Sequence, residues 1–147
     1  MPADYLLSHV AVYLVARRDE QILLLRRYNT GWKDGMYTLP AGHVDDGETV
    51  AAAMAREAKE EADIIIPEDA LAFAHVMQRK SNDRREYIDF FFEARTWQGM
   101  PQNNEPDKCD HLDWFDVNAL PPNMIEHVTV ALGHIAEGKP FSSYAFP

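Results

Sequence analysis

The chain has 147 residues, which predicts a single domain over residues 1–147, since typical domains contain about 100–200 residues. Its hydrophobic content of 46% and charged content of 26% are ordinary for globular proteins and exclude a chain that is mainly disordered. Acidic residues outnumber basic residues by 24 to 14, and the net charge of −10 argues against both nucleic acid and anionic membranes as partners.

Two β-strands are predicted near the N-terminus, at residues 9–15 and 21–25. In both segments β-branched, aromatic or leucine side chains gather, and a polar connection of hairpin length separates them. Residues 29–35 contain two glycines and several turn-forming residues, which predicts a loop. A short strand is predicted at 36–39, where Pro40 ends it.

A helix is predicted over residues 48–62, because this segment is rich in alanine and glutamate and contains neither glycine nor proline. At about 100° per residue its apolar side chains form one stripe, which we expect to pack closely against a sheet. The stripe consists of Val50, Ala51, Met54, Ala55, Ala58 and Ala62.

The second half of the chain alternates apolar segments with polar connections. The almost continuously apolar residues 87–92 are typical of a central strand that is covered on both faces. Residues 99–110 form a long polar loop with two prolines. Further strands are predicted at 71–78, 86–96 and 111–115, and a second helix at 121–137. This order predicts an α+β fold, a sandwich built on a mixed sheet.

Cys109 is the one cysteine, which excludes a disulfide within the chain and a cysteine-rich zinc site. A lone cysteine fits a reducing compartment, and we interpret it as a thiol in a loop or at a strand edge. The first residues lack the basic and apolar regions of a signal peptide, and no apolar run approaches the about 20 residues of a membrane span. We therefore expect a soluble, cytoplasmic protein that is a monomer or a homodimer.

Three glutamates of the predicted helix lie on one face, because Glu57, Glu60 and Glu61 are spaced i, i+3 and i+4. Three like charges repel each other there, and a divalent cation that prefers oxygen ligands would reverse that cost. The cluster lies about 110° around the helix from the alanine stripe, at the rim of the packed face. The alternative is a solvated glutamate face partnered by Arg56 and Lys59.

The segment from Gly42 to Ile64 resembles the Nudix box, Gly-x5-Glu-x7-Arg-Glu-aliphatic-x-Glu-Glu-x-Gly-aliphatic. Six of the seven fixed identities are present, a match expected by chance with a probability on the order of 10⁻⁴. They are Gly42, Glu48, Arg56, Glu57, Glu60 and Glu61. Segments before and after the box also resemble the family, so the likeness covers roughly residues 8–137.

The box departs from the family pattern at three positions. Asp63 replaces the glycine that ends the helix, where a left-handed backbone is common, and Asp tolerates that conformation better than most residues. Ala58 is small for the aliphatic position. Ala41 stands where many members have a second glycine, and the family geometry needs only its backbone carbonyl. We expect these departures to leave activity intact.

The resemblance implies an α/β/α sandwich with a mixed central sheet flanked by helices. It also implies hydrolysis, dependent on Mg²⁺ or Mn²⁺, of a pyrophosphate bond in a nucleoside diphosphate linked to another moiety. One alternative is a nucleoside triphosphate cleaved to monophosphate and pyrophosphate. Another alternative is a nucleotide-binding module without catalysis. The complete glutamate trio argues against it, because a module that only binds does not need these residues.

The resemblance also assigns roles within the box. Glu57 and Glu61 are expected to hold the metal together with the Ala41 carbonyl, and Glu60 to join them or to orient a water ligand. Arg56 is expected to orient a carboxylate. Glu48 is expected to anchor the loop by capping the start of the helix.

Members of the family often draw a further acidic ligand or base from outside the box. Glu105 and Asp107 are the first candidates, and we favour Glu105 because Pro106 stiffens its backbone. Asp89 and Glu93 are further candidates, and Asp89 is also a candidate for contact with substrate. Three more side chains are predicted to contact a nucleotide. They are Arg26 and Arg27 for its phosphates and Tyr37 for stacking on its base.

Overall fold

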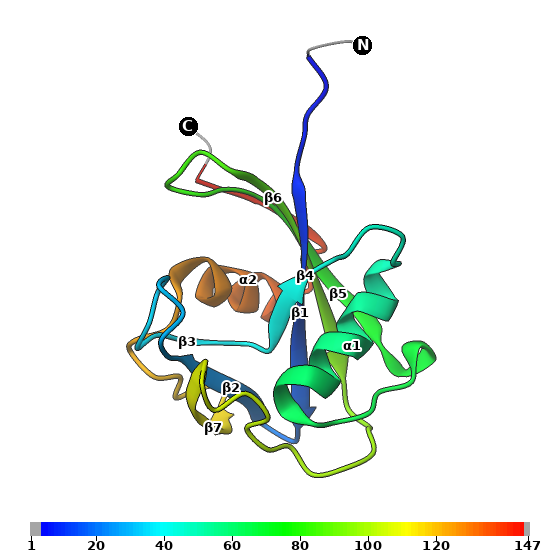
Figure 1. Cartoon of the computed structure of the whole chain (residues 1–147), viewed down its shortest axis with the longest axis vertical. Coiled ribbons are helices and arrows are strands. Elements are labelled where there is room, and N and C mark those ends of the chain that lie inside the picture. The colour runs from blue at the N-terminus through cyan, green and yellow to red at the C-terminus, as the bar shows by residue number, and fades with distance from the viewer. Residues whose placement is uncertain (1–3, 146–147) are drawn as a thin grey trace.

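The computed structural model describes residues 4–145 and has one mixed sheet of eight strands, with a helix on each face (Figure 1). The strands are β1 (His9–Arg18), β2 (Gln21–Arg27), β3 (Tyr37–Thr38), β4 (Ala41–His43), β5 (Ala72–Lys80), β6 (Glu86–Ala94), β7 (Cys109–Asp116) and β8 (Phe141–Tyr144). The helices are α1 (Val50–Ala62) and α2 (Glu126–Ala136), with a 3₁₀ turn η1 (Glu68–Ala70) after α1. The predicted sandwich is confirmed.

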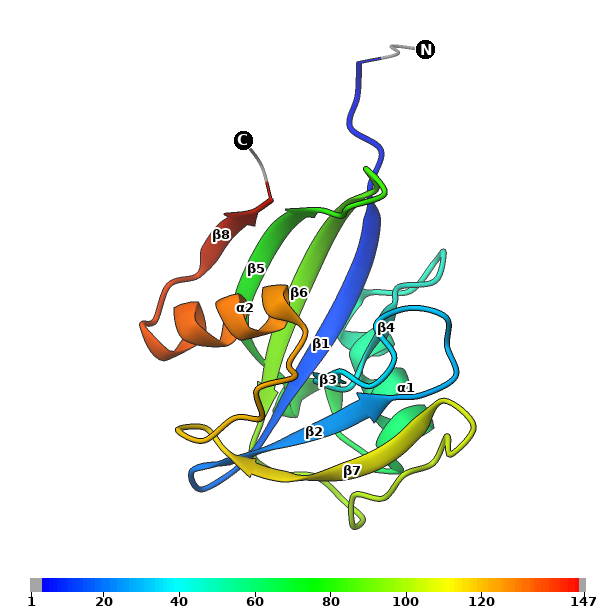
Figure 2. The ribbon, with the colours of Figure 1, turned by 90° about the vertical axis from the view of Figure 1, so that its left-hand side faces the viewer.

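Strand β1 connects the parts of the sheet, whose main order is β3-β2-β1-β6-β5-β8. Its first half lies between β4 and β6, with Ala11 opposite both His43 and Asp89, and it runs parallel to β6. Its last residues pair with β2, where Arg17 lies opposite Ile22. Figure 2 shows β2 and β7 turned away from the direction of β1, β5 and β6. Strand β4 pairs with β1 and contacts α1.

Two hydrophobic cores lie on opposite faces of the sheet because β1 alternates its side chains. Val12 and Leu14 belong to the core under α1, whereas Ala11 and Tyr13 belong to the core under α2. The buried residues of α1 are Ala53, Met54, Ala58 and Ala62. The predicted stripe is therefore partly wrong, because Ala53 is fully buried whereas Val50, Ala51 and Ala55 are only partly covered.

The buried face of α1 is thus rotated toward its glutamates. Ala53, Glu57 and Glu61 are spaced i, i+4 and i+8 and share one side of the helix. Because Ala53 is buried, Glu57 and Glu61 on the same side are partly covered, whereas Glu60 is exposed. The acidic cluster therefore lies deeper than the rim position that the helical spacing predicted.

The sequence analysis missed two strands and misplaced several boundaries, among them the end of β1, which extends to Arg18 and not to residue 15. Strand β4 has three residues, too few for a periodic pattern, and it forms because β1 pairs with it. Strand β8 forms by parallel pairing with β5. Helix α2 begins five residues later than predicted, since Asn123 and Ile125 form backbone hydrogen bonds with Tyr37 instead. Strand β7 begins at Cys109, earlier than predicted.

The described part of the chain, residues 4–145, contains no helix that is long and apolar enough to cross a membrane.

Candidate active site

Helix α1 is fixed at both ends by its own sequence. The Thr49 hydroxyl accepts a hydrogen bond from the Ala52 N–H at 3.1 Å and caps the first turn. Asp63 ends the helix with φ 56° and ψ 36°, the left-handed conformation expected at the family's glycine position. The prediction that Glu48 caps the helix is wrong. The Glu48 carboxylate instead accepts the Asp45 N–H at 2.9 Å and so anchors the preceding loop.

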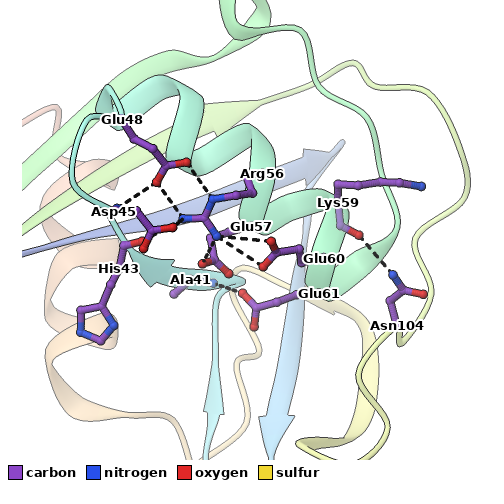
Figure 3. A network of polar contacts seen from close by, with 10 residues as sticks. All are labelled: Ala41, His43, Asp45, Glu48, Arg56, Glu57, Lys59, Glu60, Glu61 and Asn104. Carbon is purple, nitrogen blue, oxygen red and sulfur yellow. Dashed lines mark hydrogen bonds and ion pairs between the residues drawn. The ribbon is translucent and has the colours of Figure 1, made fainter.

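Arg56 is the centre of the polar network in Figure 3. Its guanidinium donates to both oxygens of Glu48, at 2.7 and 2.8 Å, and to Glu57 Oε1 at 2.9 Å. It also donates to the His43 carbonyl at 3.1 Å and approaches Glu60 at 3.4 Å. The Arg56 hydrogen bonds, with that from the Asp45 N–H, lower the pKa of Glu48 to about 2. Glu48 is therefore ionised at neutral pH and holds Arg56 against Glu57.

Glu57 and Glu61 are two carboxylates that are poorly solvated and close to one another. The Glu61 Oε1 accepts the Ala41 N–H at 2.8 Å. Burial raises the pKa of Glu61 well above its usual value, and the charge of Glu57 adds to this shift. Burial likewise raises the pKa of Glu57, which Arg56 opposes. Their ionised forms are therefore costly in the protein alone, and a cation bound beside them would lower that cost.

Gly42 allows Glu57 to approach the strand β4. A Cβ at position 42 would lie 2.0 Å from the Glu57 carboxyl carbon and 2.2 Å from its Oε1. These distances are far below van der Waals contact, so any side chain here would displace the carboxylate. The glycine of the box pattern at position 42 thus has a steric basis in its contact with Glu57.

Replacing Gly42 with Ala should displace the Glu57 carboxylate and so lower the hydrolysis of a nucleotide substrate, which an activity assay measures. Because the displaced atoms are the far end of a flexible side chain, the free energy of unfolding should fall by less than the about 1–3 kcal/mol that overpacking a core costs, which urea unfolding measures. Gly133→Ala is the control, because Gly133 lies in α2 with no atom near its added Cβ. The helix propensity of alanine should make that variant equally or more stable. Wild-type hydrolysis by Gly42→Ala would contradict the steric argument.

A cavity of about 300 Å³ lies beside Glu61. It is lined by Leu25, Arg27, Asn29, Thr30, Glu61, Glu105, Lys108 and Cys109. The negative charge of Glu105 contributes to the raised pKa of Glu61 and of Glu57, so these carboxylates lie within electrostatic reach of one another. The positive charge of Arg27 acts on Glu61 in the opposite direction. The cavity therefore combines acidic and basic side chains from separate segments.

The structure brings Glu105 to the cavity and leaves Asp107 exposed outside its lining. Lys108 also lines it, and the sequence analysis missed this residue. No local pattern marks Lys108, because its position depends on a turn in which its N–H donates to the Glu105 carbonyl at 2.9 Å. Cys109 is buried at the start of β7, with its thiol against the His111 carbonyl.

The predicted nucleotide contacts lie in different surroundings. Arg27 lines the cavity, and its guanidinium donates to the Trp32 carbonyl at 2.7 Å and to Thr30 Oγ1 at 2.8 Å. Arg26 is paired with Asp110 at 2.7 Å. Tyr37 is 7% exposed, and its hydroxyl lies 2.6 Å from His111 Nδ1. Of these three predicted contacts, Arg27 is thus the one that lines the cavity together with Glu61 and Glu105.

The structure does not bring Asp89 or Glu93 to the cavity. Asp89 is fully buried on the α2 side of the sheet, where the Arg79 Nε donates to it at 2.7 Å. That ion pair leaves Asp89 no surface to offer to a substrate. Glu93 pairs with Arg95 at 2.8 Å and approaches Arg17 at 3.6 Å.

The acidic cluster has the donor chemistry of part of a metal site. Across residues 4–145, no three acidic, histidine or cysteine side chains are arranged closely enough to hold an ion by themselves. Mg²⁺ is usually bound by one or two carboxylates and completes its shell with water and substrate phosphates. The poorly solvated pair Glu57 and Glu61 therefore fits this requirement in donor chemistry.

Comparison with known proteins agrees with the site. The model of the NUDIX domain matches residues 7–131. The chain is 32% identical over 123 residues to an ADP-ribose pyrophosphatase of Methanocaldococcus jannaschii. The matched region covers 84% of this chain and 70% of that protein. It is 30% identical over 108 residues to the uncharacterized Nudix hydrolase YvcI of Bacillus subtilis, covering 72% of this chain and 65% of that protein.

Among solved structures, a MutT NUDIX hydrolase from Burkholderia pseudomallei has the same fold. The TM-score is 0.80 at 27% identity, over 86% of this chain and 97% of that chain. The family model and this likeness extend well beyond the 23-residue box segment from Gly42 to Ile64. The chain therefore belongs to the Nudix family and is a Nudix-type pyrophosphohydrolase.

Proposed function

We propose that the protein uses Mg²⁺ or Mn²⁺ to hydrolyse the pyrophosphate bond of a nucleoside diphosphate linked to another moiety. The observation that carries this proposal is the cavity in which Glu61 and Glu105 lie together with Arg27 and Lys108. Hydrolysis of a polyanion needs acidic groups for a cation and for water, and basic groups for phosphate oxygens. The relative named ADP-ribose pyrophosphatase supports this substrate class.

The box residues form the metal-holding side of the site in this proposal. Glu57, Glu61 and the Ala41 carbonyl would hold the divalent ion, and the exposed Glu60 would bind it or one of its waters. When bound, such an ion screens phosphate charge and lowers the pKa of a bound water. Arg56 keeps Glu57 in position through its hydrogen bond at 2.9 Å, because Glu48 fixes the other edge of the guanidinium.

Glu105 acts as the general base in this proposal and takes a proton from the attacking water. Its carboxylate faces the cavity, and its backbone is held by Asn103, whose Oδ1 accepts the Glu105 N–H at 3.1 Å. Arg27 and Lys108 bind phosphate oxygens. Arg26 and Tyr37 do not line the cavity and are assigned no substrate contact in this proposal, because Arg26 is paired with Asp110 and the Tyr37 ring is buried.

A substrate panel tests the proposal. The wild-type protein is incubated with Mn²⁺ or Mg²⁺ and ADP-ribose, other linked nucleoside diphosphates, and nucleoside triphosphates, and the products are separated by chromatography. The proposal expects a nucleoside monophosphate and a second phosphorylated moiety, with no reaction in EDTA. Pyrophosphate released from triphosphates alone would favour the alternative substrate class. Absence of hydrolysis with every substrate would contradict a catalytic role.

Metal binding should also be visible without a substrate. Mg²⁺ or Mn²⁺ should raise the melting temperature, because an ion that binds only the folded state stabilises it by about 2.7 kcal/mol at 100 times its Kd. The increment should vanish when Glu57, Glu60 and Glu61 are all replaced by Gln. An equal increment in that triple variant would place the ion elsewhere among the 24 acidic side chains.

A further inference from the structure

The loop that carries Glu105 is bound along the C-terminal end of α1. The Gln102 N–H donates to the Ala62 carbonyl at 3.0 Å, and the Asn104 N–H donates to the Glu61 carbonyl at 3.1 Å. The Asn104 side chain adds a contact to the Lys59 carbonyl at 3.3 Å, which Figure 3 shows. The last carbonyls of a helix lack hydrogen-bond donors within the helix, and this loop supplies the missing donors.

Residues 103–109 form a compact turn. The Lys108 and Cys109 N–H groups both donate to the Glu105 carbonyl at 2.9 Å. The Asn103 side chain donates to the Cys109 carbonyl at 2.6 Å. Because these bonds close the turn on itself, the position of Glu105 and Lys108 relative to Glu61 depends on how the turn is attached to α1.

Asp63 provides a side-chain attachment at this junction. Its carboxylate accepts a hydrogen bond from the Gln102 side-chain nitrogen at 2.6 Å and pairs with Lys59 one turn earlier. The family's glycine would satisfy the left-handed backbone at this position equally well, but it has no side chain with which to hold Gln102. The departure at position 63 therefore adds a contact between the helix and the loop.

We propose that Asp63 is a positioning residue, whose carboxylate holds Gln102 and thereby keeps Glu105 turned toward Glu61 in the cavity. Asp63 does not line the cavity, so it acts through the loop and not on the substrate. This inference rests on the proposed function, in which Glu105 serves as the base.

The Asp63→Gly variant separates positioning from stability. Glycine accepts φ 56° without strain, so the melting temperature of the metal-free protein should stay within about 3 °C of the wild type. The kcat should fall about tenfold, because a small displacement of a catalytic group is costly. Amide hydrogen exchange at residues 102–109 should be faster in the metal-free variant. Asp19→Gly is the matched control, since Asp19 has φ 54° in the β1–β2 turn, and it should change neither kcat nor this exchange.

Two further variants test the route through Gln102. Asp63→Asn keeps an oxygen acceptor and should retain near wild-type kcat. Gln102→Ala should lower kcat as Asp63→Gly does, and the double variant should be no worse than either single one, since both remove the same contact.

Wild-type kcat and unchanged exchange in Asp63→Gly would overturn the inference while leaving the proposed function intact. A lower melting temperature with unchanged kcat would show a merely structural role and would overturn it equally. If the wild type hydrolyses no substrate, the proposed function fails separately. The exchange experiment then still decides whether Asp63 holds the loop.

Discussion

Replacing Glu61 with Gln should lower kcat by at least about 10²-fold, a loss of about 2.7 kcal/mol of transition-state stabilisation. Glu61 is the glutamate that both borders the cavity and contacts the Ala41 N–H. Glutamine keeps the length of the side chain and an oxygen for that N–H, so the fold is retained. Steady-state hydrolysis of the best substrate of the panel measures the effect. Glu68→Gln, at an exposed position in η1, is the control and should keep full activity.

The same variant should be at least as stable as the wild type in the absence of metal. The folded-state pKa of Glu61 lies above its unfolded value, because burial and the charge of Glu57 disfavour the ionised form. Between the two pKa values the folded protein binds more protons than the unfolded chain, so stability falls as the pH rises through that window. Glutamine removes this loss.

Thermal unfolding of the two proteins in EDTA measures this difference in stability. The advantage of Glu61→Gln should grow as the pH rises above the usual carboxyl range and then level off. A large fall in the metal-free melting temperature would mean that Glu61 is a structural partner in the fold and not a metal ligand.

Replacing Glu105 with Gln should lower kcat by about 10²-fold or more, the usual contribution of a general base. In contrast to the box glutamates, Glu105 should leave metal affinity nearly unchanged, because its assigned task is proton transfer. Hydrolysis assays and titration of Mn²⁺ binding in the absence of substrate measure the two quantities separately. The loop should keep its structure, since its turn is closed by backbone and Asn103 contacts that the Glu105 side chain does not make.

Asp107→Asn is the matched control for Glu105→Gln. Asp107 lies two residues further along the same loop, but it is exposed and does not line the cavity. It should therefore keep wild-type kcat. Full activity in Glu105→Gln would exclude this residue as the base. The base would then have to be one of the box glutamates, because Asp89 is buried against Arg79 and Glu93 is paired outside the cavity.

The fold class and the helix that carries the acidic residues could be predicted from the sequence. Local features sufficed there, because the segment is rich in good helix formers, although the first turn is capped by Thr49 and not by Glu48 as predicted. The left-handed backbone at Asp63 also followed from the pattern, because the position after a helix end strongly restricts the residue type. The spacing of Glu57, Glu60 and Glu61 placed them on one face before any tertiary contact was known.

How deep those glutamates lie, and which residues lie near them, depends on contacts between distant segments. Helical periodicity gives the relative angles of side chains but not the face that a sheet selects, so the rotation toward Ala53 could not be read from α1 alone. Strand β4 exists because β1 pairs with it, and Glu57 reaches β4 because Gly42 lacks a side chain.

The choice of Glu105 over Asp107, and the presence of Lys108, depend on a loop that folds back onto the end of α1. Asp89, in contrast, lies away from the cavity, because its carboxylate is buried in an ion pair with Arg79. These positions are set by contacts between segments far apart in the chain, and local propensity carries no information about them. The acidic helix could therefore be predicted from local sequence, whereas the side chains that line the cavity with Glu61 are set by tertiary contacts.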